Sequence, residues 1–318
     1  MRRKFFQFFL TLSILCFCGC GTSILSEIKE YVQTSAPLES KYLETGPYAV
    51  KCIQRDAGDY KLKEFRIWYP AELEENRKKQ YPAIVICNGT GYRATRFMTV
   101  FRHLASWGFV VIGTEEKWTG KGRGAILCLK FLLNENQTPD SPFYRKIDPD
   151  RLGIAGHSQG GAGAINAVTK YPEGKYFKAL FTISGINQTL AESWLMRCPY
   201  DPGRLKIPVM MTATSNPYGW DEDHPERKDL GICTLASLKE NRDAILKQND
   251  TTVIIARVAN KKKYHAENLA MSTPYMTAWF VYWLQGDASA GRFFLRNDPE
   301  LSKNPCWQDV EIHLQKQK

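Results

Sequence analysis

Apolar and polar residues follow two periods along the chain, one typical of strands and one typical of helices. Residues 48–55 and 60–69 alternate between apolar and polar side chains, as antiparallel strands with one solvated face do. Residues 83–87 and 109–112 are continuous apolar runs, the pattern of strands buried on both faces. Between these runs, residues 96–107 place apolar side chains at helical spacing. The pattern predicts a strand–helix–strand unit beside two edge strands.

The same alternation of elements continues to about residue 284. Strands that alternate with helices predict a doubly wound α/β fold, in which helices flank a mostly parallel sheet. No repeat or low-complexity segment interrupts it, so one domain is expected over residues 46–318. The further strands are expected at residues 151–155, 179–183, 207–212 and 251–258, and the further helices at 122–133, 161–170, 234–246 and 266–284.

The N-terminus has the pattern of a segment that directs export. Basic residues at 2–4 precede an apolar stretch that is too short for a typical membrane span, and small residues follow it. We therefore expect a signal peptide over residues 1–19. Its end resembles a bacterial lipobox, in which the new N-terminal cysteine, here Cys20, is lipidated, although Phe17 replaces the usual aliphatic residue. Residues 20–45 are then expected to form a tether, and plain secretion or a retained anchor stay open as alternatives.

Composition and charge narrow the class of protein. With 43% hydrophobic and 24% charged residues, the chain can form a full core. Loss of residues 1–19 lowers the formal net charge from +10 to +7, and the remaining basic residues are scattered apart from a cluster at 261–263. Nucleic-acid binding is therefore not expected.

Six cysteines remain after Cys20, and their spacing does not suggest a metal site. No C-x-x-C pair or histidine-rich spacing is present, so neither a metal ion nor an organic cofactor is expected. Export permits disulfides, but the sequence does not choose among the possible pairings. Cys87 and Cys128 lie in apolar runs and are expected to be buried thiols.

The clearest candidate for chemistry is a serine between glycines. Residues 156–160 read GHSQG and fit the G-x-S-x-G pattern of a nucleophile elbow, with Ser158 at its centre. Chance can produce so short a pattern. However, an expected strand precedes it and an expected helix follows it, which is the context the motif requires. Ser158 is therefore predicted to be a nucleophile.

The base that Ser158 would need is predicted to be His265. A serine hydroxyl is activated by a histidine, which a third group orients. His265 follows the last strand expected before the final helix, and loops at the carboxyl ends of strands line the site in an open α/β sheet. A surface loop histidine is the alternative. The other histidines are less suitably placed: His103 on an expected helix, His157 beside the serine, His224 in a loop and His313 in the C-terminal tail.

The acid of the triad is expected in the loop over residues 213–223. Asp221 is the chosen residue, because Pro217 and Gly219 can bend the loop before it. The alternatives in the same loop are Asp223, Glu222 and the uncharged Asn216, which is the earliest polar candidate for the usual acid position.

Two backbone N–H groups are predicted to form an oxyanion hole. One belongs to Gln159, directly after the nucleophile, and the other is assigned to Thr90 in the glycine-containing loop 88–92. Three aromatic residues on loops at the same expected edge are candidates for an apolar substrate wall: Tyr92, Trp118 and Trp220.

Several of these segments resemble the α/β-hydrolase superfamily. The branch concerned holds bacterial cutinases, polyester hydrolases and dienelactone-hydrolase-like esterases. Residues 104–112, LASWGFVVI, are similar to its "LASHGFVV" segment, residues 156–161 to its elbow, and residues 278–287 to its final helix. The resemblance covers roughly residues 45–310. It implies the same nucleophile, base and oxyanion hole, whereas the loop that contains Asp221 departs from the family's usual aspartate loop by an apparent insertion.

The function that follows is an exported serine hydrolase that cleaves small-molecule or polymeric carboxylic esters through an acyl-enzyme, without a cofactor. A peptidase or an acyltransferase on the same fold is the nearest alternative, because a fold does not determine a substrate. A binding lipoprotein that has lost its acid is the alternative outside enzymes.

Overall fold

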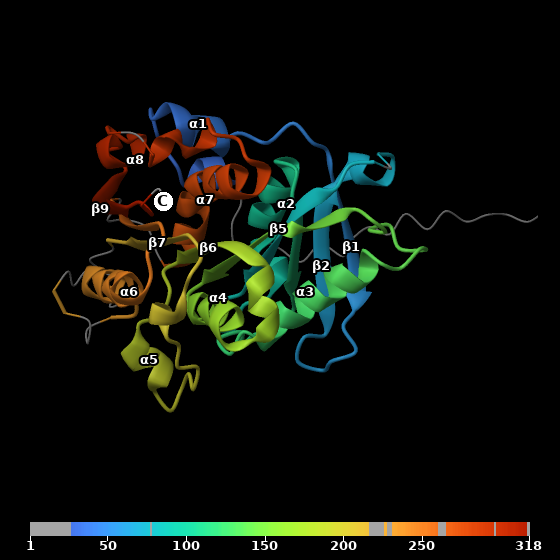
Figure 1. The fold of residues 1–318 in the computed structure, drawn as a ribbon, viewed down its shortest axis with the longest axis horizontal. Helices are drawn as coiled ribbons and strands as arrows, with labels where there is room; N and C mark the ends of the chain where they lie inside the picture. Colours follow the sequence, from blue (N-terminus) through green and yellow to red (C-terminus); the bar gives the residue numbers. More distant parts are fainter. Residues whose placement is uncertain are drawn as a thin grey trace, which may run out of the picture.

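One nine-stranded sheet runs through the described part of the chain (Figure 1). The computed structural model describes residues 27–76, 78–215, 226–227, 231–259, 265–295 and 297–316. The strands are β1 (Val50–Asp56), β2 (Glu64–Pro70), β3 (Tyr81–Cys87), β4 (Val110–Thr114), β5 (Ile147–His157), β6 (Phe177–Ile183), β7 (Val209–Thr214), β8 (Val253–Val258) and β9 (Trp307–His313). Their order is β1-β2-β4-β3-β5-β6-β7-β8-β9. Strands β3 to β8 pair in parallel, and β1, β2 and β9 complete the two edges with antiparallel pairs.

Burial along the strands follows the apolar pattern of the sequence. Every residue of β3, β4, β7 and β8 is buried, because helices cover both faces of the parallel part of the sheet. The edge strand β1 has no buried residue, and it pairs antiparallel with β2. This arrangement confirms the predicted doubly wound, mostly parallel α/β sheet.

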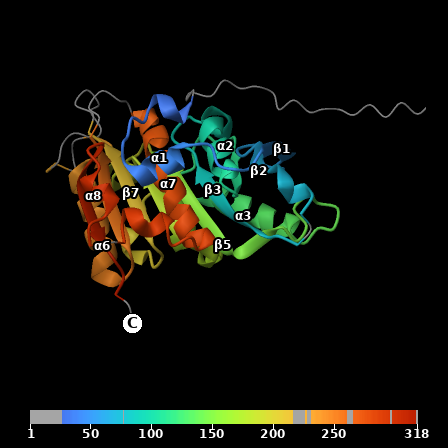
Figure 2. The same cartoon turned by 90° about the horizontal axis from the view of Figure 1, so that it is seen from above.

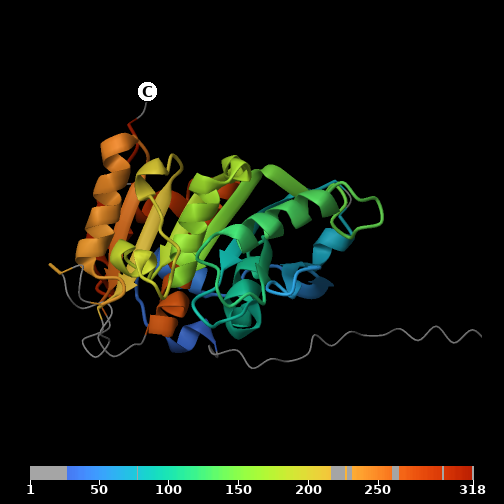
Figure 3. The ribbon, with the colours of Figure 1, turned by 90° about the horizontal axis from the view of Figure 1, so that it is seen from below.

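Two layers of helices cover the two faces of the sheet. On one face α3, α4 and α6 lie side by side, drawn in green, yellow-green and orange in Figure 3. On the other face α2 and α7 pack on the sheet, and α1 lies against α7 (Figure 2). The helices are α1 (Pro37–Leu43), α2 (Met98–Ser106), α3 (Arg123–Glu135), α4 (Gln159–Lys170), α5 (Gln188–Glu192), α6 (Leu235–Gln248), α7 (Asn268–Gln285) and α8 (Glu300–Lys303). Short 3-10 helices include η1 (Ile28–Glu30), η3 (Ala94–Phe97) and η6 (His265–Glu267).

The expected tether over residues 20–45 is wrong for its described part, because residues 28–43 pack on the domain. Tyr42 is fully buried beside α2, and its carbonyl oxygen lies 2.9 Å from Nε2 of His103. The Glu300 carboxylate accepts hydrogen bonds from the N–H groups at the start of α1. These contacts join segments that are far apart in the chain. The sequence pattern of the seven-residue helix α1 reports only local preferences, so it could not predict them. Residues 1–26, with Cys20, lie outside the described residues.

The C-terminal tail contains a strand that the sequence did not predict. Residues 307–313 form β9 and pair antiparallel with β8, so His313 lies in the sheet rather than in a free tail. None of the described helices combines the length and hydropathy that crossing a membrane requires. All six described cysteines are thiols, and Cys87 and Cys128 are buried, as predicted.

Candidate active site

Ser158 occupies a strained turn between β5 and α4. Its backbone has φ 57° and ψ −126°, a conformation that residues other than glycine rarely adopt. The turn is held in place because the Ser158 N–H donates to the Ile183 carbonyl at 2.9 Å, and the Ser158 carbonyl accepts from the Gly161 N–H at 2.8 Å. This strand–turn–helix geometry is the one expected of a nucleophile elbow, and it lies at the carboxyl end of the parallel strands.

The elbow is possible because α4 starts in direct contact with the end of β3. A Cβ atom placed on Gly160 would lie 2.2 Å from the Cys87 carbonyl oxygen and 2.5 Å from that of Asn88. Only glycine allows the helix to approach the strand so closely. The approach brings loop 88–92 next to the first turn of α4.

Loop 88–92 borders Ser158 directly. A Cβ atom on Gly89 would lie 3.3 Å from Cβ of Ser158. The Asn88 side chain fixes the loop by donating to the Thr114 carbonyl at 2.7 Å, and the Asn88 carbonyl accepts from Oγ1 of Thr119 at 2.7 Å. Neither the Thr90 N–H nor the Gln159 N–H donates to another described residue. The two predicted oxyanion-hole residues therefore lie in adjoining segments, and both N–H groups are available as donors.

His265 lies beside the elbow. It begins η6 after β8, and its carbonyl oxygen is 3.1 Å from Nε2 of His157, the residue before the nucleophile. The ring centroids of His157 and His265 are 4.8 Å apart. Oγ of Ser158 forms no hydrogen bond with another described residue, and such bonds in catalytic sites often tighten only when substrate binds. The structure thus brings the predicted base into contact with the residue that precedes the predicted nucleophile.

His157 contacts the segment that contains His265, which the sequence did not predict. Its ring is buried, and it packs edge-on against Phe97 as well as contacting the His265 segment. No local pattern could indicate this contact, because His157 and His265 are 108 residues apart in the chain.

The loop that should hold the acid starts beside the strand that leads to His265. Thr214 ends β7 and pairs with Val258 at the end of β8, and the Ser215 hydroxyl donates to the Val258 carbonyl at 2.8 Å. The two loops therefore leave neighbouring strand ends. The candidate acids Asp221, Asp223, Glu222 and Asn216 lie outside the described residues, as do Trp220 and His224.

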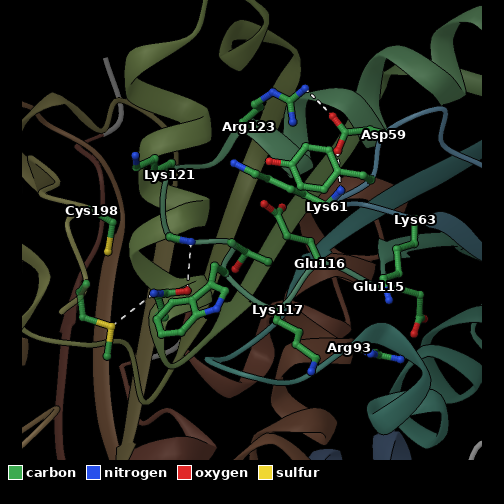
Figure 4. Close-up of a pocket in the computed structure, with 16 residues that line it drawn as sticks. Asp59, Lys61, Lys63, Arg93, Glu115, Glu116, Lys117, Lys121, Arg123 and Cys198 are labelled. Atoms are coloured by element: carbon green, nitrogen blue, oxygen red, sulfur yellow. Dashed lines mark hydrogen bonds and ion pairs between the residues drawn. The ribbon is translucent and has the colours of Figure 1, made fainter.

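A cavity of about 630 Å³ opens beside Gln159. Most of its wall comes from residues 59–61, 63, 115–121 and 123, and the rest from Arg93, Gln159, Met196 and Cys198 (Figure 4). We call it the basic cavity, because six of its lining residues are Lys or Arg and three are Asp or Glu. Of the predicted aromatic wall, Trp118 lines this cavity and is 50% exposed, whereas Tyr92 packs against Phe97.

Two buried titratable side chains have shifted pKa values. Burial raises the pKa of Glu116, which lies in the wall of the basic cavity, to about 7. Burial lowers the pKa of His103 to about 4, so this histidine is neutral in the core, away from the elbow. In the described ranges, no group of three or more His, Cys, Asp or Glu side chains could hold a metal ion.

Comparison with known proteins shows the family to which this chain belongs. A family model described as PETase, PET hydrolase-like, matches residues 29–308. The chain is 30% identical over 152 residues to the bis(hydroxyethyl) terephthalate hydrolase of Streptomyces coelicolor, covering 45% of this chain and 46% of that protein. It is 28% identical over 150 residues to cutinase 2 of Thermobifida cellulosilytica, covering 44% of this chain and 52% of that protein. The chain thus spans about half the length of these relatives. The matches confirm the predicted resemblance to the cutinase and polyester-hydrolase branch of the α/β-hydrolases.

Proposed function

Because the chain belongs to the PET hydrolase-like family, we propose that it hydrolyses carboxylic esters through an acyl-enzyme formed on Ser158. The observation that supports this most is the backbone of Ser158, which keeps a strained conformation in a turn whose use is to present a nucleophile. The printed names of the relatives, cutinases and a bis(hydroxyethyl) terephthalate hydrolase, are consistent with an ester substrate, small or polymeric.

In the proposed reaction, Oγ of Ser158 attacks the ester carbonyl while His265 takes the hydroxyl proton. The N–H groups of Thr90 and Gln159 stabilise the oxyanion of the tetrahedral intermediate. The acyl–oxygen bond then breaks, and the alcohol leaves with the proton from His265. Water, activated by the same imidazole, adds to the acyl carbon and releases the acid and the serine hydroxyl. Asp221 is proposed to orient His265 and to stabilise its charged form.

Hydrolysis of p-nitrophenyl esters of increasing acyl length tests this function together with its acid. The wild-type protein is expected to release p-nitrophenol, and Asp221→Asn to lower kcat by about 10³- to 10⁴-fold, because an amide holds the imidazole in the wrong tautomer. Matched Asp223→Asn and Glu222→Gln variants are expected to stay within about threefold of wild type, as charges away from the imidazole contribute little.

The outcomes of that experiment separate the alternatives. A large loss in Asp223→Asn or Glu222→Gln instead of Asp221→Asn would move the acid to that residue. An unchanged rate in all three, with Asn216→Ala impaired, would assign the orienting group to the amide. Absence of turnover with every ester, from protein with a native circular dichroism spectrum, would reject ester hydrolysis.

We also propose that the protein is exported and anchored to a membrane through a lipid on Cys20, after removal of residues 1–19. The basic N-terminus, the short apolar stretch and the residues around Cys20 support this location. The Cys20→Ala variant is expected to move from the membrane fraction to the soluble fraction, because stable anchoring depends on buried acyl chains. Globomycin should retard processing of the wild type alone, and a membrane-bound Cys20→Ala protein would contradict lipidation.

A further inference from the structure

The basic cavity adjoins the proposed catalytic site at its inner end. Gln159, whose N–H is a proposed oxyanion donor, lines the cavity, and its side-chain oxygen accepts from the Gly120 N–H at 3.4 Å. Nε2 of Gln159 lies 3.3 Å from Sδ of Met196, and Cys198 and Trp118 lie in the same wall. The end of the cavity beside the elbow is therefore largely apolar.

Each acidic residue of the cavity either interacts with a neighbouring polar or basic side chain or is only partly ionised. Asp59 forms a 2.7 Å ion pair with Arg123, which holds the pKa of Asp59 at about 2. Glu115 accepts a 2.9 Å hydrogen bond from the hydroxyl of Thr95 and lies 3.7 Å from Nε of Arg66. Glu116 is buried, and with a pKa of about 7 its carboxyl group is only partly ionised at neutral pH.

The basic residues around the cavity are mostly left unneutralised. Lys61, Lys63, Lys117 and Lys121 are exposed, and their ammonium groups form no ion pair within the described ranges. In Figure 4, Arg93 and Lys117 lie on one side of Glu116 and Lys61 on the other. Like charges gathered around one cavity repel one another, and a cleft lined by one sign of charge attracts ions of the opposite sign. This distribution indicates a site for a negatively charged group.

We propose that the basic cavity selects esters that carry a second, ionised acid group, such as half esters of dicarboxylic acids. This inference rests on the proposed hydrolysis at Ser158. The reacting ester group lies at the elbow, the carbon chain lies along the apolar inner wall by Trp118 and Met196, and the distal carboxylate lies among the lysine ammonium groups. Hydrolysis breaks the acyl–oxygen bond and releases an alcohol and a dicarboxylate.

A matched pair of esters tests the selectivity. Mono-p-nitrophenyl glutarate and p-nitrophenyl valerate have the same acyl length and differ in a terminal carboxylate against a methyl group. We expect wild-type kcat/KM to be higher for the glutarate. The Lys117→Gln/Lys121→Gln variant is expected to lower the ratio of glutarate to valerate kcat/KM by about tenfold, mostly through KM, because complementary charge favours the anion in binding. Added salt should lower the wild-type ratio as well.

A lysine outside the cavity serves as the control. Lys247 is exposed in the last turn of α6, and Lys247→Gln should leave the ratio unchanged. A ratio that does not change in Lys117→Gln/Lys121→Gln, with valerate still hydrolysed, would overturn the inference and leave the proposed function intact. Failure of the wild type to hydrolyse either ester would overturn both.

Discussion

The Ser158→Ala variant is expected to lose ester hydrolysis by a factor of about 10⁴ or more, with its fold retained. Without Oγ no acyl-enzyme can form, and the oxyanion hole and substrate binding alone sustain only a small residual rate. Alanine keeps the Cβ atom of serine, so the strain of the turn at φ 57° is similar in both proteins. Oγ of Ser158 forms no hydrogen bond to another described residue, so its removal leaves no described partner unsatisfied. The melting temperature should change by less than about 2 °C.

The measurement is kcat/KM on a p-nitrophenyl ester, together with labelling by an organophosphonate. Wild-type protein should gain one phosphonyl group, which peptide mass spectrometry places on Ser158, and Ser158→Ala should gain none. Turnover within about tenfold of wild type in Ser158→Ala would exclude this serine as nucleophile.

The sequence alone predicted the strands and helices that their own residues specify. The apolar runs at 83–87 and 109–112 lie in strands buried on both faces, and hydrophobic periodicity reports such burial directly. Boundaries were less accurate: β5 begins at Ile147, before the expected residue 151, because Asp148 and Pro149 have the composition of a turn. Its first residue still pairs with Tyr81, through a register shift that no local pattern encodes.

Contacts between distant segments account for what the sequence did not predict. Glu39 in α1 accepts hydrogen bonds from Asn304 at 2.6 Å and Trp307 at 2.8 Å, so the N-terminal segment depends on the C-terminus for its place. The four lysines that line the cavity are scattered in the sequence, and they gather because the β1–β2 and β4–α3 connections lie side by side. The places of Ser158 and His265 after strand ends could be predicted, because the apolar pattern indicated a mostly parallel sheet, and their catalytic roles stay a prediction.

Gly160→Ala is expected to destabilise the fold strongly, although Gly160 lies in the first turn of a helix. Glycine to alanine inside a helix normally stabilises by about 1 kcal/mol, because alanine has the higher helix propensity. Here the new methyl group would meet three backbone atoms of Cys87 and Asn88 between 2.2 and 2.7 Å. Backbone atoms at a strand end cannot turn away as a flexible side chain can, so α4 must separate from β3. We expect unfolding free energy to fall by about 3 kcal/mol and the melting temperature by about 6–10 °C.

Gly185→Ala is the matched control for that experiment, because it adds the same methyl group near the elbow without a steric clash. Its Cβ atom would lie 3.7 to 3.9 Å from Gly161 and Thr182, which is ordinary contact. Thermal unfolding should therefore place Gly185→Ala within about 1 kcal/mol of wild type. Because separation of α4 from β3 also moves Gln159 away from loop 88–92, Gly160→Ala should lose activity even below its melting temperature. Equal unfolding free energies of the two variants would show that the end of β3 moves to accommodate the methyl group. The close packing at Gly160 would then not be needed for the conformation of the elbow.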